Sequence, residues 1–536
     1  MTISRPTEPY PDGSWSGWGD PAQAPTLPDS VLSLLRDALG VKAPGHVPGS
    51  IDELALPMPR IGATARAALE AALGASHVHD DAGWRVRHTR GKSTPDLLRL
   101  RAGDMSDAPD LVLLPADHEQ VLAVLEICTE HRVAVVPFGG GTSVVGGLAP
   151  RTEEFAGMVA LDLRRLNALL ELDEPSRLAV LEPGLRGPEA EALLGASGYT
   201  IGHHPQSFEY ATIGGYAAAR SSGQSSAGYG RFDELVMGLR VATPTGSLSL
   251  GRAPKSAAGP DLRQLFLGSE GAFGVITSVT VAVRPVPEAR VYEGWRFDSF
   301  ANGRDCLRRL AQDGPTPTVL RLSDEAETAI NLARPAELGA EAAGGSMAIV
   351  GFEGAADEVA QRREQVAGIL RASGAEPDPA AGEGWAHDRY RGPYLRDALL
   401  DAGALVETLE TVTFWSGLPR LYADVSAALR DSLAGQGTPP VVLCHVSHIY
   451  RAGASLYFTV GCAALEQPVE QWRAAKAAAS DAILAAGASI THHHGIGTDH
   501  RDWYAQEIGP LGVEILRGVK RRLDPAGILN PGVLIP

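Results

Sequence analysis

The stretch PFGGGTSVVGG, residues 137–147, contains five glycines and no lysine or arginine, and it directly follows the apolar run Val133–Val136. A glycine-rich turn after a strand lets backbone N–H groups approach an anionic group closely. The stretch therefore favours a diphosphate cradle, although a plain structural turn would also explain its glycines. It lacks both the P-loop lysine and the GxGxxG spacing of the dinucleotide-binding fold. Gly91-Lys92-Ser93 resembles the end of a P-loop, but Val86 stands where that loop needs its first glycine.

The composition is that of a large, acidic, folded protein. A chain of 536 residues is too long for one ordinary core, so two large domains, or one domain with a cap, are expected. The net charge of −17 argues against broad nucleic-acid binding, which needs clustered lysine and arginine. No apolar run approaches the roughly 20 residues that span a bilayer, and the N-terminus has no signal-peptide core. The four cysteines lack CxxC spacing and are interpreted as reduced core residues. We therefore expect a cytoplasmic enzyme, with membrane association left open.

Apolar periodicity predicts the main helices and strands. We expect helices over 63–75, Glu119–Glu130 and Val469–Ala486, and strands over Leu111–Leu114, Val133–Val136, 158–163, 178–184 and Val275–Val283. The small-residue segment 202–230 predicts a loop system around a flat ligand, with a long surface loop as the alternative. After Pro287, alternating strand and helix patterns predict an antiparallel sheet with helices on one face. A short strand after Gly487 is expected to carry three consecutive histidines.

Three segments, PFGGGTS, PQSFEYATIGG and GSEGAFGVITSVTVAVRPVP, occur in an informative order. Together they resemble the FAD-binding domain of the vanillyl-alcohol-oxidase (PCMH-type) flavoproteins. LRDALLDAGALVETLETVTFW, CHVSHIYRAGASLYF and HHHGIG resemble, more narrowly, the alkyldihydroxyacetonephosphate synthases, which are flavoenzymes of ether-lipid synthesis. The resemblance covers nearly the whole chain.

The resemblance implies an α+β fold in four parts. Residues 1–103 would form an N-terminal arm and helical region, and residues 104–286 a two-subdomain FAD-binding domain. Residues 287–480 would form an α+β cap with an antiparallel sheet, which binds the substrate. Residues 481–536 would return to the FAD site. The family also implies a homodimer.

The family's FAD contacts fall on four segments of this chain. The implied residues are Pro137, Phe138, Gly139, Gly140, Gly141, Thr142, Ser143, Val144, Gln206, Ser207, Phe208, Glu209, Tyr210, Ala211, Thr212, Ala219, Arg220, Ser221, Ser222, Glu270, Gly271, Ala272, Phe273, Gly274, Val275 and Ile276. His203 and His204 lie near a region where relatives attach flavin covalently, but the glycine loop contains no histidine. Because the resembling synthases hold FAD non-covalently, we expect a dissociable cofactor.

The resemblance also assigns roles in the cap. Tyr457 matches the family's acid/base tyrosine, and His492, His493 and His494 would support it or contact the substrate. Arg396 matches the arginine that holds the substrate phosphate, a task that suits a bidentate guanidinium. Arg321 lies in an apolar alternation and needs a partner, either at the flavin and its substrate or in a structural carboxylate. Without the resemblance, Tyr457 would be an ordinary core residue and Arg396 a solvated one.

No metal centre is expected. Related hydroxy-acid dehydrogenases carry motifs close to HxGDGNxH and EHGxG, and here Ala452 replaces the second histidine and His493 the glutamate. Consecutive strand residues also alternate between faces, so three adjacent histidines would not easily share one ion. His445 stands where the synthases usually have arginine, and its role stays open.

The function that the resemblance implies is the exchange of the acyl chain of an acyl-dihydroxyacetone phosphate for a fatty alcohol, through a flavin N5 adduct. The expected partner is thus a lipid-like small molecule whose chain occupies an apolar tunnel in the cap. Peripheral contact with a membrane is compatible with such a substrate. The alternatives are an FAD-dependent oxidase or dehydrogenase of a hydroxy acid or alcohol, and a flavin-free binding protein.

Overall fold

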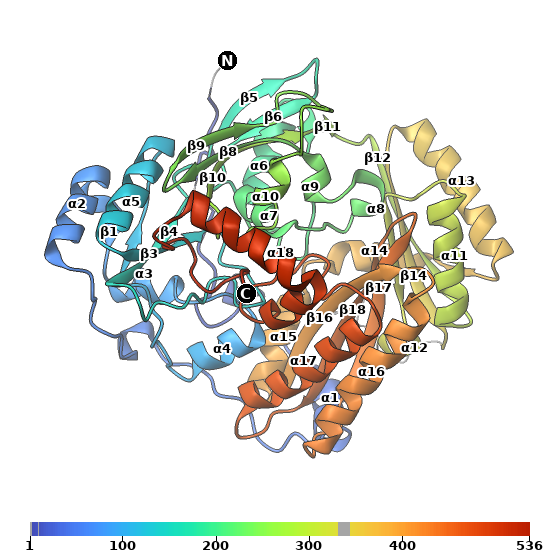
Figure 1. Ribbon diagram of the computed structural model, residues 1–536. Helices are drawn as coiled ribbons and strands as arrows, with labels where there is room; N and C mark the ends of the chain where they lie inside the picture. The colour runs from blue at the N-terminus through green and yellow to red at the C-terminus, as the bar shows by residue number, and fades with distance from the viewer. Residues whose placement is uncertain (1–2, 9, 331–343) are drawn as a thin grey trace.

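The computed structural model describes residues 3–8, 10–330 and 344–536. Three main sheets organise these residues (Figure 1). A four-stranded and a five-stranded sheet form the predicted FAD-binding half, and a seven-stranded sheet forms the cap. The predicted α+β fold with an antiparallel cap sheet is confirmed.

The four-stranded sheet carries the glycine loop. Its elements are α2 (Ala63–Leu73), β1 (Val78–His79), β2 (Leu111–Leu113), α5 (His118–Glu130), β3 (Val133–Phe138) and β4 (Gly157–Asp162). The strand order is β1-β2-β4-β3, and β2, β4 and β3 run parallel. Parallel strands need a crossover, and α5 supplies it with a buried face that includes Val121, Leu125 and Cys128. The loop of residues 139–144 therefore leaves the carboxyl end of β3.

The five-stranded sheet is antiparallel, in the order β5-β6-β10-β8-β9. It is made of β5 (Leu169–Asp173), β6 (Leu178–Leu181), β8 (Val236–Thr243), β9 (Gly246–Leu250) and β10 (Val275–Ala282). The chain between and around these strands forms α6 (Gly187–Gly195), β7 (Tyr199–Thr200), α7 (Ile213–Ala219), α8 (Ser226–Tyr229), α9 (Phe232–Leu235), α10 (Arg263–Phe266) and β11 (Arg284–Pro285). Helix α7 packs against β10 and α5 against β8, so the two subdomains share packed side chains.

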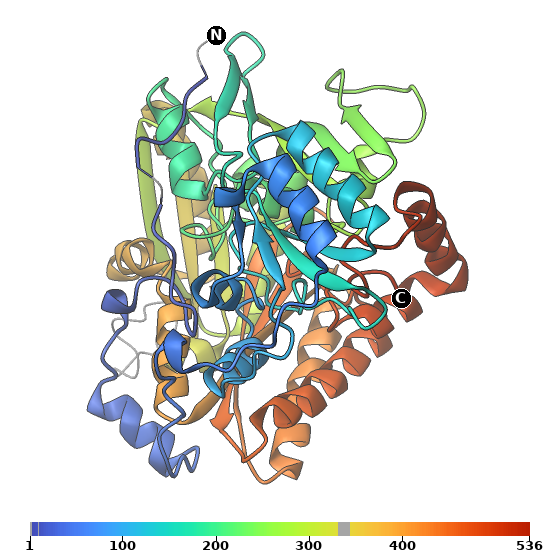
Figure 2. The same ribbon diagram turned by 90° about the vertical axis from the view of Figure 1, so that its left-hand side faces the viewer.

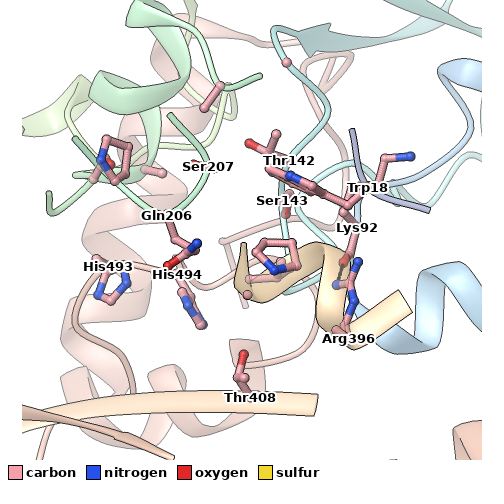
Figure 3. A pocket seen from close by; sticks show the side chains of 18 of the residues that line it. Trp18, Lys92, Thr142, Ser143, Gln206, Ser207, Arg396, Thr408, His493 and His494 are labelled. Carbon is pink, nitrogen blue, oxygen red and sulfur yellow. Dashed lines mark hydrogen bonds between the residues drawn. The ribbon is translucent and has the colours of Figure 1, made fainter. Parts of the chain in front are cut away.

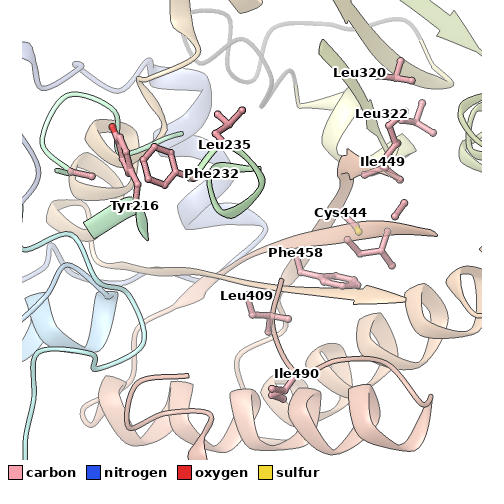
Figure 4. Close-up of a cluster of buried hydrophobic side chains, with 14 of the residues drawn as sticks. Tyr216, Phe232, Leu235, Leu320, Leu322, Leu409, Cys444, Ile449, Phe458 and Ile490 are labelled. Carbon is pink, nitrogen blue, oxygen red and sulfur yellow. The ribbon is translucent and has the colours of Figure 1, made fainter. Parts of the chain in front are cut away.

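The cap sheet has the order β15-β12-β14-β13-β17-β18-β16. Its strands are β12 (Ala289–Phe297), β13 (Val319–Ser323), β14 (Ser346–Gly354), β15 (Glu376–Asp378), β16 (Ala404–Phe414), β17 (Val441–Ile449) and β18 (Gly453–Ala463). Its helices are α11 (Phe300–Gln312), α12 (Glu325–Ala329), α13 (Ala356–Ala372), α14 (Pro379–Asp388), α15 (Gly392–Asp401), α16 (Leu418–Gly435) and α17 (Pro468–Ala485). Side chains alternate along these strands. Figure 4 shows Cys444 and Phe458 in the apolar core, whereas their neighbours His445 and Tyr457 line a cavity on the other face.

The two ends of the chain close over this framework. The arm that precedes α1 (Asp29–Asp37) runs along the outside of the molecule (Figure 2), where Ser4 pairs with Leu169 and Trp18 is buried. Helices α3 (Ala82–Arg87) and α4 (Thr94–Arg101) follow it. At the other end, α18 (Arg501–Leu523) is kinked at Gly509, and Leu529 pairs with Val135 of β3.

Two expectations about local structure were wrong. The segment 202–230 is not loop throughout, because α7 and α8 form within it. The segment that delivers the histidines is not a strand: Ser489 makes one isolated bridge to Val412, and His492–His494 lie in a loop. The other predicted helices and strands named above agree with the structure to within a few residues.

Candidate active site

A cavity of about 570 Å³ lies between the glycine loop and the open face of the cap sheet. Most of the predicted cofactor residues line it, namely Pro137, Phe138, Gly139, Gly140, Gly141, Thr142, Ser143, Val144, Gln206, Ser207, Ala211, Thr212, Ala219, Ser221, Ser222, Glu270, Gly271, Gly274, Val275 and Ile276. Figure 3 shows Thr142, Ser143, Gln206 and Ser207 on one side and Thr408, His493 and His494 on the other. The structure thus brings motifs from both halves of the chain to one site.

Six of the predicted cofactor residues do not line this cavity: Phe208, Glu209, Tyr210, Arg220, Ala272 and Phe273. Their contacts are structural. The Tyr210 ring meets the Trp18 ring at 5.6 Å, and Arg220 donates from Nε to the carbonyl of Leu267 at 2.9 Å. Ala272 and Phe273 belong to the apolar core. These residues support the walls of the cavity without forming them.

The glycine loop has the properties of an anion cradle. Among the described residues, no hydrogen bond engages the backbone N–H groups of residues 139–144. A Cβ on Gly140 would overlap the carbonyl oxygen of Tyr210, and a Cβ on Gly139 would overlap Thr212 Oγ1. Glycine is therefore required where the loop packs against residues 210–212. Unpaired amides that face a cavity suit the diphosphate of FAD, so the residues present fit the predicted cofactor.

Tyr457 lies in the cap wall opposite the cradle. Its O–H donates to Thr408 Oγ1 at 3.0 Å, and burial raises the pKa of Tyr457 to about 12. The phenol is therefore protonated in the free protein and acts there as a hydrogen-bond donor. His445 stacks on the Tyr457 ring with centroids 5.0 Å apart and planes 19° apart.

His445 and Arg321 share one buried carboxylate. Glu327 receives a charged contact from Arg321 Nη2 and lies 2.9 Å from His445 Nδ1. Burial alone would raise the pKa of Glu327, but the charges of His445 and Arg321 hold it well below its usual range. Of the two partners that the sequence left open, the structure shows the structural carboxylate. Arg321 also lines the cavity, and its contact with the flavin region stays a prediction.

The histidine loop is anchored by a second buried carboxylate, which sequence reasoning missed. Glu410 accepts the backbone N–H groups of His492, His493 and His494 at 2.7, 3.1 and 3.0 Å. Although burial opposes ionisation, the three imidazoles lower the pKa of Glu410 far below its usual range. This carboxylate fixes the loop to strand β16.

Glu270 anchors the same loop from the cofactor side. Its Oε1 accepts from Ile496 N at 2.7 Å, and its Oε2 accepts from Gly497 N at 2.9 Å. Burial raises the pKa of Glu270 to about 7 despite these bonds. The loop is therefore tied to both halves of the chain.

The three histidines have different positions. His493 and His494 line the cavity, whereas the described cavity wall does not include His492. Burial lowers the pKa of His493, and it lowers the pKa of His494 to about 3, so both imidazoles are neutral. His492 lies behind them, with Nε2 2.5 Å from Tyr450 Oη.

His492–His494 do not lie on a strand, so strand geometry does not keep their side chains apart as expected. Ring nitrogens of His448, His492 and His493 all lie within 4.8 Å of one another. The loop thus brings His492 and His493 close to His448 of strand β17. The absence of a metal ion stays a prediction, resting on the replaced motif residues alone.

Arg396 is held by protein groups. Its Nε and Nη2 donate to Asp397 Oδ1, and its Nη1 donates to the carbonyl of Lys92 at 2.6 Å (Figure 3). Lys92, the lysine of the rejected P-loop pattern, also lines the cavity and donates to Ser14 O at 2.6 Å. Burial lowers the pKa of Lys92 to about 8. The backbone N–H of Lys92 donates to Ser143 O, so the backbone of Lys92 lies beside the cradle.

The cradle and the cap that faces it are typical of a two-domain FAD-linked flavoenzyme. Residues 109–250 match the model of an FAD binding domain, and residues 286–534 match the C-terminal domain of FAD linked oxidases. The solved structure of p-cresol methylhydroxylase superposes with a TM-score of 0.67, covering 88% of this chain and 96% of that one, and at 18% identity it shows the fold alone.

The nearer relatives specify the family. The chain is 35% identical to an alkyldihydroxyacetonephosphate synthase of Dictyostelium discoideum, over 85% of this chain and 78% of that protein. A solved alkyldihydroxyacetonephosphate synthase superposes with a TM-score of 0.82 at 30% identity, covering 97% of this chain and 99% of that one. The chain belongs to the alkyldihydroxyacetonephosphate synthase family, as its motifs predicted.

Proposed function

We propose that this enzyme exchanges the acyl chain of an acyl-dihydroxyacetone phosphate for a fatty alcohol, with FAD held non-covalently in the cradle of residues 139–144. One observation supports this most directly. The cavity that contains the cradle, Tyr457 and His493 also has an extensive apolar wall. The apolar wall residues are Val31, Leu34, Leu35, Leu39, Leu395, Leu399, Ala404, Val406, Val441 and Leu443, and most of them belong to one apolar cluster. A cavity that combines an apolar wall with polar groups suits a long alkyl chain with a polar head.

The side chains in the cavity can divide the proton transfers between them. When bound, FAD supplies an electrophilic ring, and the exchange as a whole requires no net oxidation. His493 and His494 are neutral and line the cavity, so either can accept the proton removed next to the substrate ketone. Tyr457 keeps its proton and can donate a hydrogen bond to the developing oxyanion.

Non-covalent binding is supported by the positions of the nearby histidines. His203 and His204 are absent from the described cavity wall, and His203 Nε2 lies 3.0 Å from Ser221 Oγ. His88 packs on the Phe138 ring. Its Nδ1 lies 2.7 Å from the carbonyl oxygen of Trp84, and its Nε2 lies 2.7 Å from Asp162 Oδ2. Both ring nitrogens of His88 are therefore engaged, and although His203 Nδ1 and His204 Nδ1 make no hydrogen bond among the described residues, neither residue lines the cavity.

The test uses purified holoenzyme, palmitoyl-dihydroxyacetone phosphate and labelled hexadecanol under anaerobic conditions. We expect labelled ether product and an equal amount of palmitate, with the oxidised flavin spectrum unchanged at the end of the reaction. Bleaching of the flavin by alcohols or hydroxy acids, without ether product, would instead assign the protein to the oxidases and dehydrogenases. Tyr457→Phe serves as the matched variant and should lose most of the exchange.

We propose further that the enzyme acts as a homodimer and meets its lipid substrates at a membrane surface. The family supports the dimer. Among the described helices, none combines the length and apolarity needed to cross a bilayer, so the contact would be peripheral. Leu34 of α1 lines the cavity and is 38% exposed, so an apolar side chain of the cavity wall is also accessible from solvent. Sedimentation of the holoenzyme alone and with vesicles tests both statements.

A further inference from the structure

We propose that Arg389, together with Arg321, forms the subsite for the phosphate of the substrate. This inference rests on the proposed function, because it assigns the phosphomonoester of that substrate to one wall of the cavity. The geometry that points to it is a wall in which two guanidinium groups keep buried N–H groups without a partner. Arg396, which the resemblance assigned to the phosphate, has its guanidinium engaged elsewhere.

The two arginines belong to one wall of the cavity because strand β13 and helix α14 pack against each other there. Val319 and Trp385 pack in one apolar cluster and both line the cavity. Arg321 follows Val319 by two residues on a strand, and so lies on the same face of the sheet. Arg389 follows Trp385 by one helical turn, and so lies above the same contact. Both arginines line the cavity.

The two guanidinium groups have unused donors. Arg389 Nη1 and Arg321 Nε are buried and make no hydrogen bond in the described part of the chain. A buried donor without a partner is costly, and native proteins rarely keep one unless a ligand or water satisfies it. Two such donors on one wall of a substrate cavity point to an anionic ligand with several acceptor oxygens.

Arg389 is positioned without an ion pair. No carboxylate among the described residues forms a salt bridge with it, although Asp388 also lines the cavity. Its guanidinium carbon lies 5.0 Å from the Tyr390 ring centroid and 5.9 Å from that of Trp385. Gln224 Nε2, from the cofactor side, donates to the carbonyl of Arg389 at 3.0 Å. Ring contacts leave the edge of a guanidinium available to a ligand.

The other arginines of the cavity differ from Arg389 in their partners. Glu327 neutralises Arg321, so Arg321 contributes a directed N–H group more than a net charge. Arg396 is paired with Asp397, and its Nη1 is used by the Lys92 carbonyl. Of the three arginines that line the cavity, Arg389 is the one with no salt bridge to a carboxylate among the described residues. A cation without such a partner discriminates a phosphate ester from a neutral head group.

The experiment compares palmitoyl-dihydroxyacetone phosphate with its dephosphorylated analogue, palmitoyl-dihydroxyacetone, in the holoenzyme. Arg389→Met should lower kcat/KM for the phosphorylated substrate by about 10- to 100-fold, mainly through KM, the usual range for loss of a charge-assisted hydrogen bond. Activity on the analogue should fall much less, because the analogue has no phosphate for Arg389 to bind. Arg389→Lys keeps the charge and should recover part of the loss.

Arg391→Met is the matched control, since Arg391 lies two residues away and is not among the described cavity residues. Equal losses on both substrates in Arg389→Met would show a structural role and overturn the inference. The same follows if Arg389→Met and Arg391→Met behave alike. If a variant is too weakly active to assay, titration with glycerol 3-phosphate, followed by the flavin spectrum, replaces kinetics: wild-type binding by Arg389→Met would refute the subsite. Absence of ether product with the wild-type enzyme on either substrate would refute the proposed function instead.

Discussion

Replacing Glu410 by glutamine removes the negative charge and keeps the side chain nearly the same size, so it tests what the charge contributes to stability and activity. The carboxylate accepts the three backbone N–H groups of His492, His493 and His494. Hydrogen bonds to a charged acceptor contribute roughly 1 kcal/mol more than neutral ones. For three bonds, Glu410→Gln should therefore lower the free energy of unfolding by about 3 kcal/mol. The amide must also place an N–H group against one of the three donors, which should displace the loop.

The activity should fall more than fold stability alone explains. A displacement of about 1 Å at a catalytic group can cost on the order of 100-fold in rate, so we expect kcat of the exchange to fall about 10- to 100-fold. Glu410 also raises the pKa of His493 and His494. Without its charge these imidazoles should stay neutral to still lower pH, and the acid limb of the kcat profile should move downward.

The assay measures kcat against pH together with thermal unfolding of the holoenzyme. Thr491→Val is the matched control, because it removes the Thr491 hydroxyl that donates to Glu410 Oε1 at 2.5 Å and leaves the charge in place. It should lower stability by about 1 kcal/mol and leave the acid limb where it is. A Glu410→Gln enzyme with wild-type kcat and an unmoved acid limb would refute the positioning role.

Four further outcomes are expected. Gly140→Ala should abolish FAD retention, because the new Cβ overlaps the Tyr210 carbonyl; the flavin absorbance of the purified variant measures this. Acid precipitation should release all FAD into the supernatant, and flavin left on the pellet would disprove non-covalent binding. Since burial raises the pKa of Glu270 from 4.5 to about 7, native protein binds the extra proton in this interval, and the free energy of unfolding should fall by up to about 3 kcal/mol as pH rises through it; Glu270→Gln should flatten that dependence in thermal melts. Tyr457→Phe should bind substrate normally but lose about 100-fold in kcat, the range for one oxyanion donor.

The cofactor half of the fold could be predicted from sequence because its signals are local. The apolar run before the glycine loop is strand β3, and Glu119–Glu130 forms a helix one residue longer than expected. These features depend on periodicity and steric preferences within a few residues, and the sequence carries both. The close approach of residues 210–212 to Gly139 and Gly140 is a contact between distant segments, and only the structure shows it.

The arrangement of the candidate site residues could not be predicted, because it depends on contacts between residues that are far apart in the sequence. Glu410 lies in an alternating strand pattern, where a glutamate usually faces solvent, yet it is 1% exposed because the histidine loop covers it. Arg389 follows the last residue of α14 and has no periodic signal. Lys92 was not predicted as a site residue, because the P-loop pattern that contains it was rejected. It lines the cavity, and its backbone N–H donates to Ser143 O. None of these pairings has a local signature.

Two buried carboxylates, Glu410 and Glu270, hold the short histidine loop between the two halves of the chain. Glu410 holds residues 492–494 to the cap, and Glu270 holds residues 496–497 to the loop that follows the five-stranded sheet's helix α10. Both sets of hydrogen bonds are made by backbone N–H groups, and the imidazoles of His493 and His494 line the cavity. Because Glu410 is firmly ionised and Glu270 titrates near pH 7, the attachment to the cap is fixed. The attachment to the cofactor half is then the one whose protonation state changes near neutral pH.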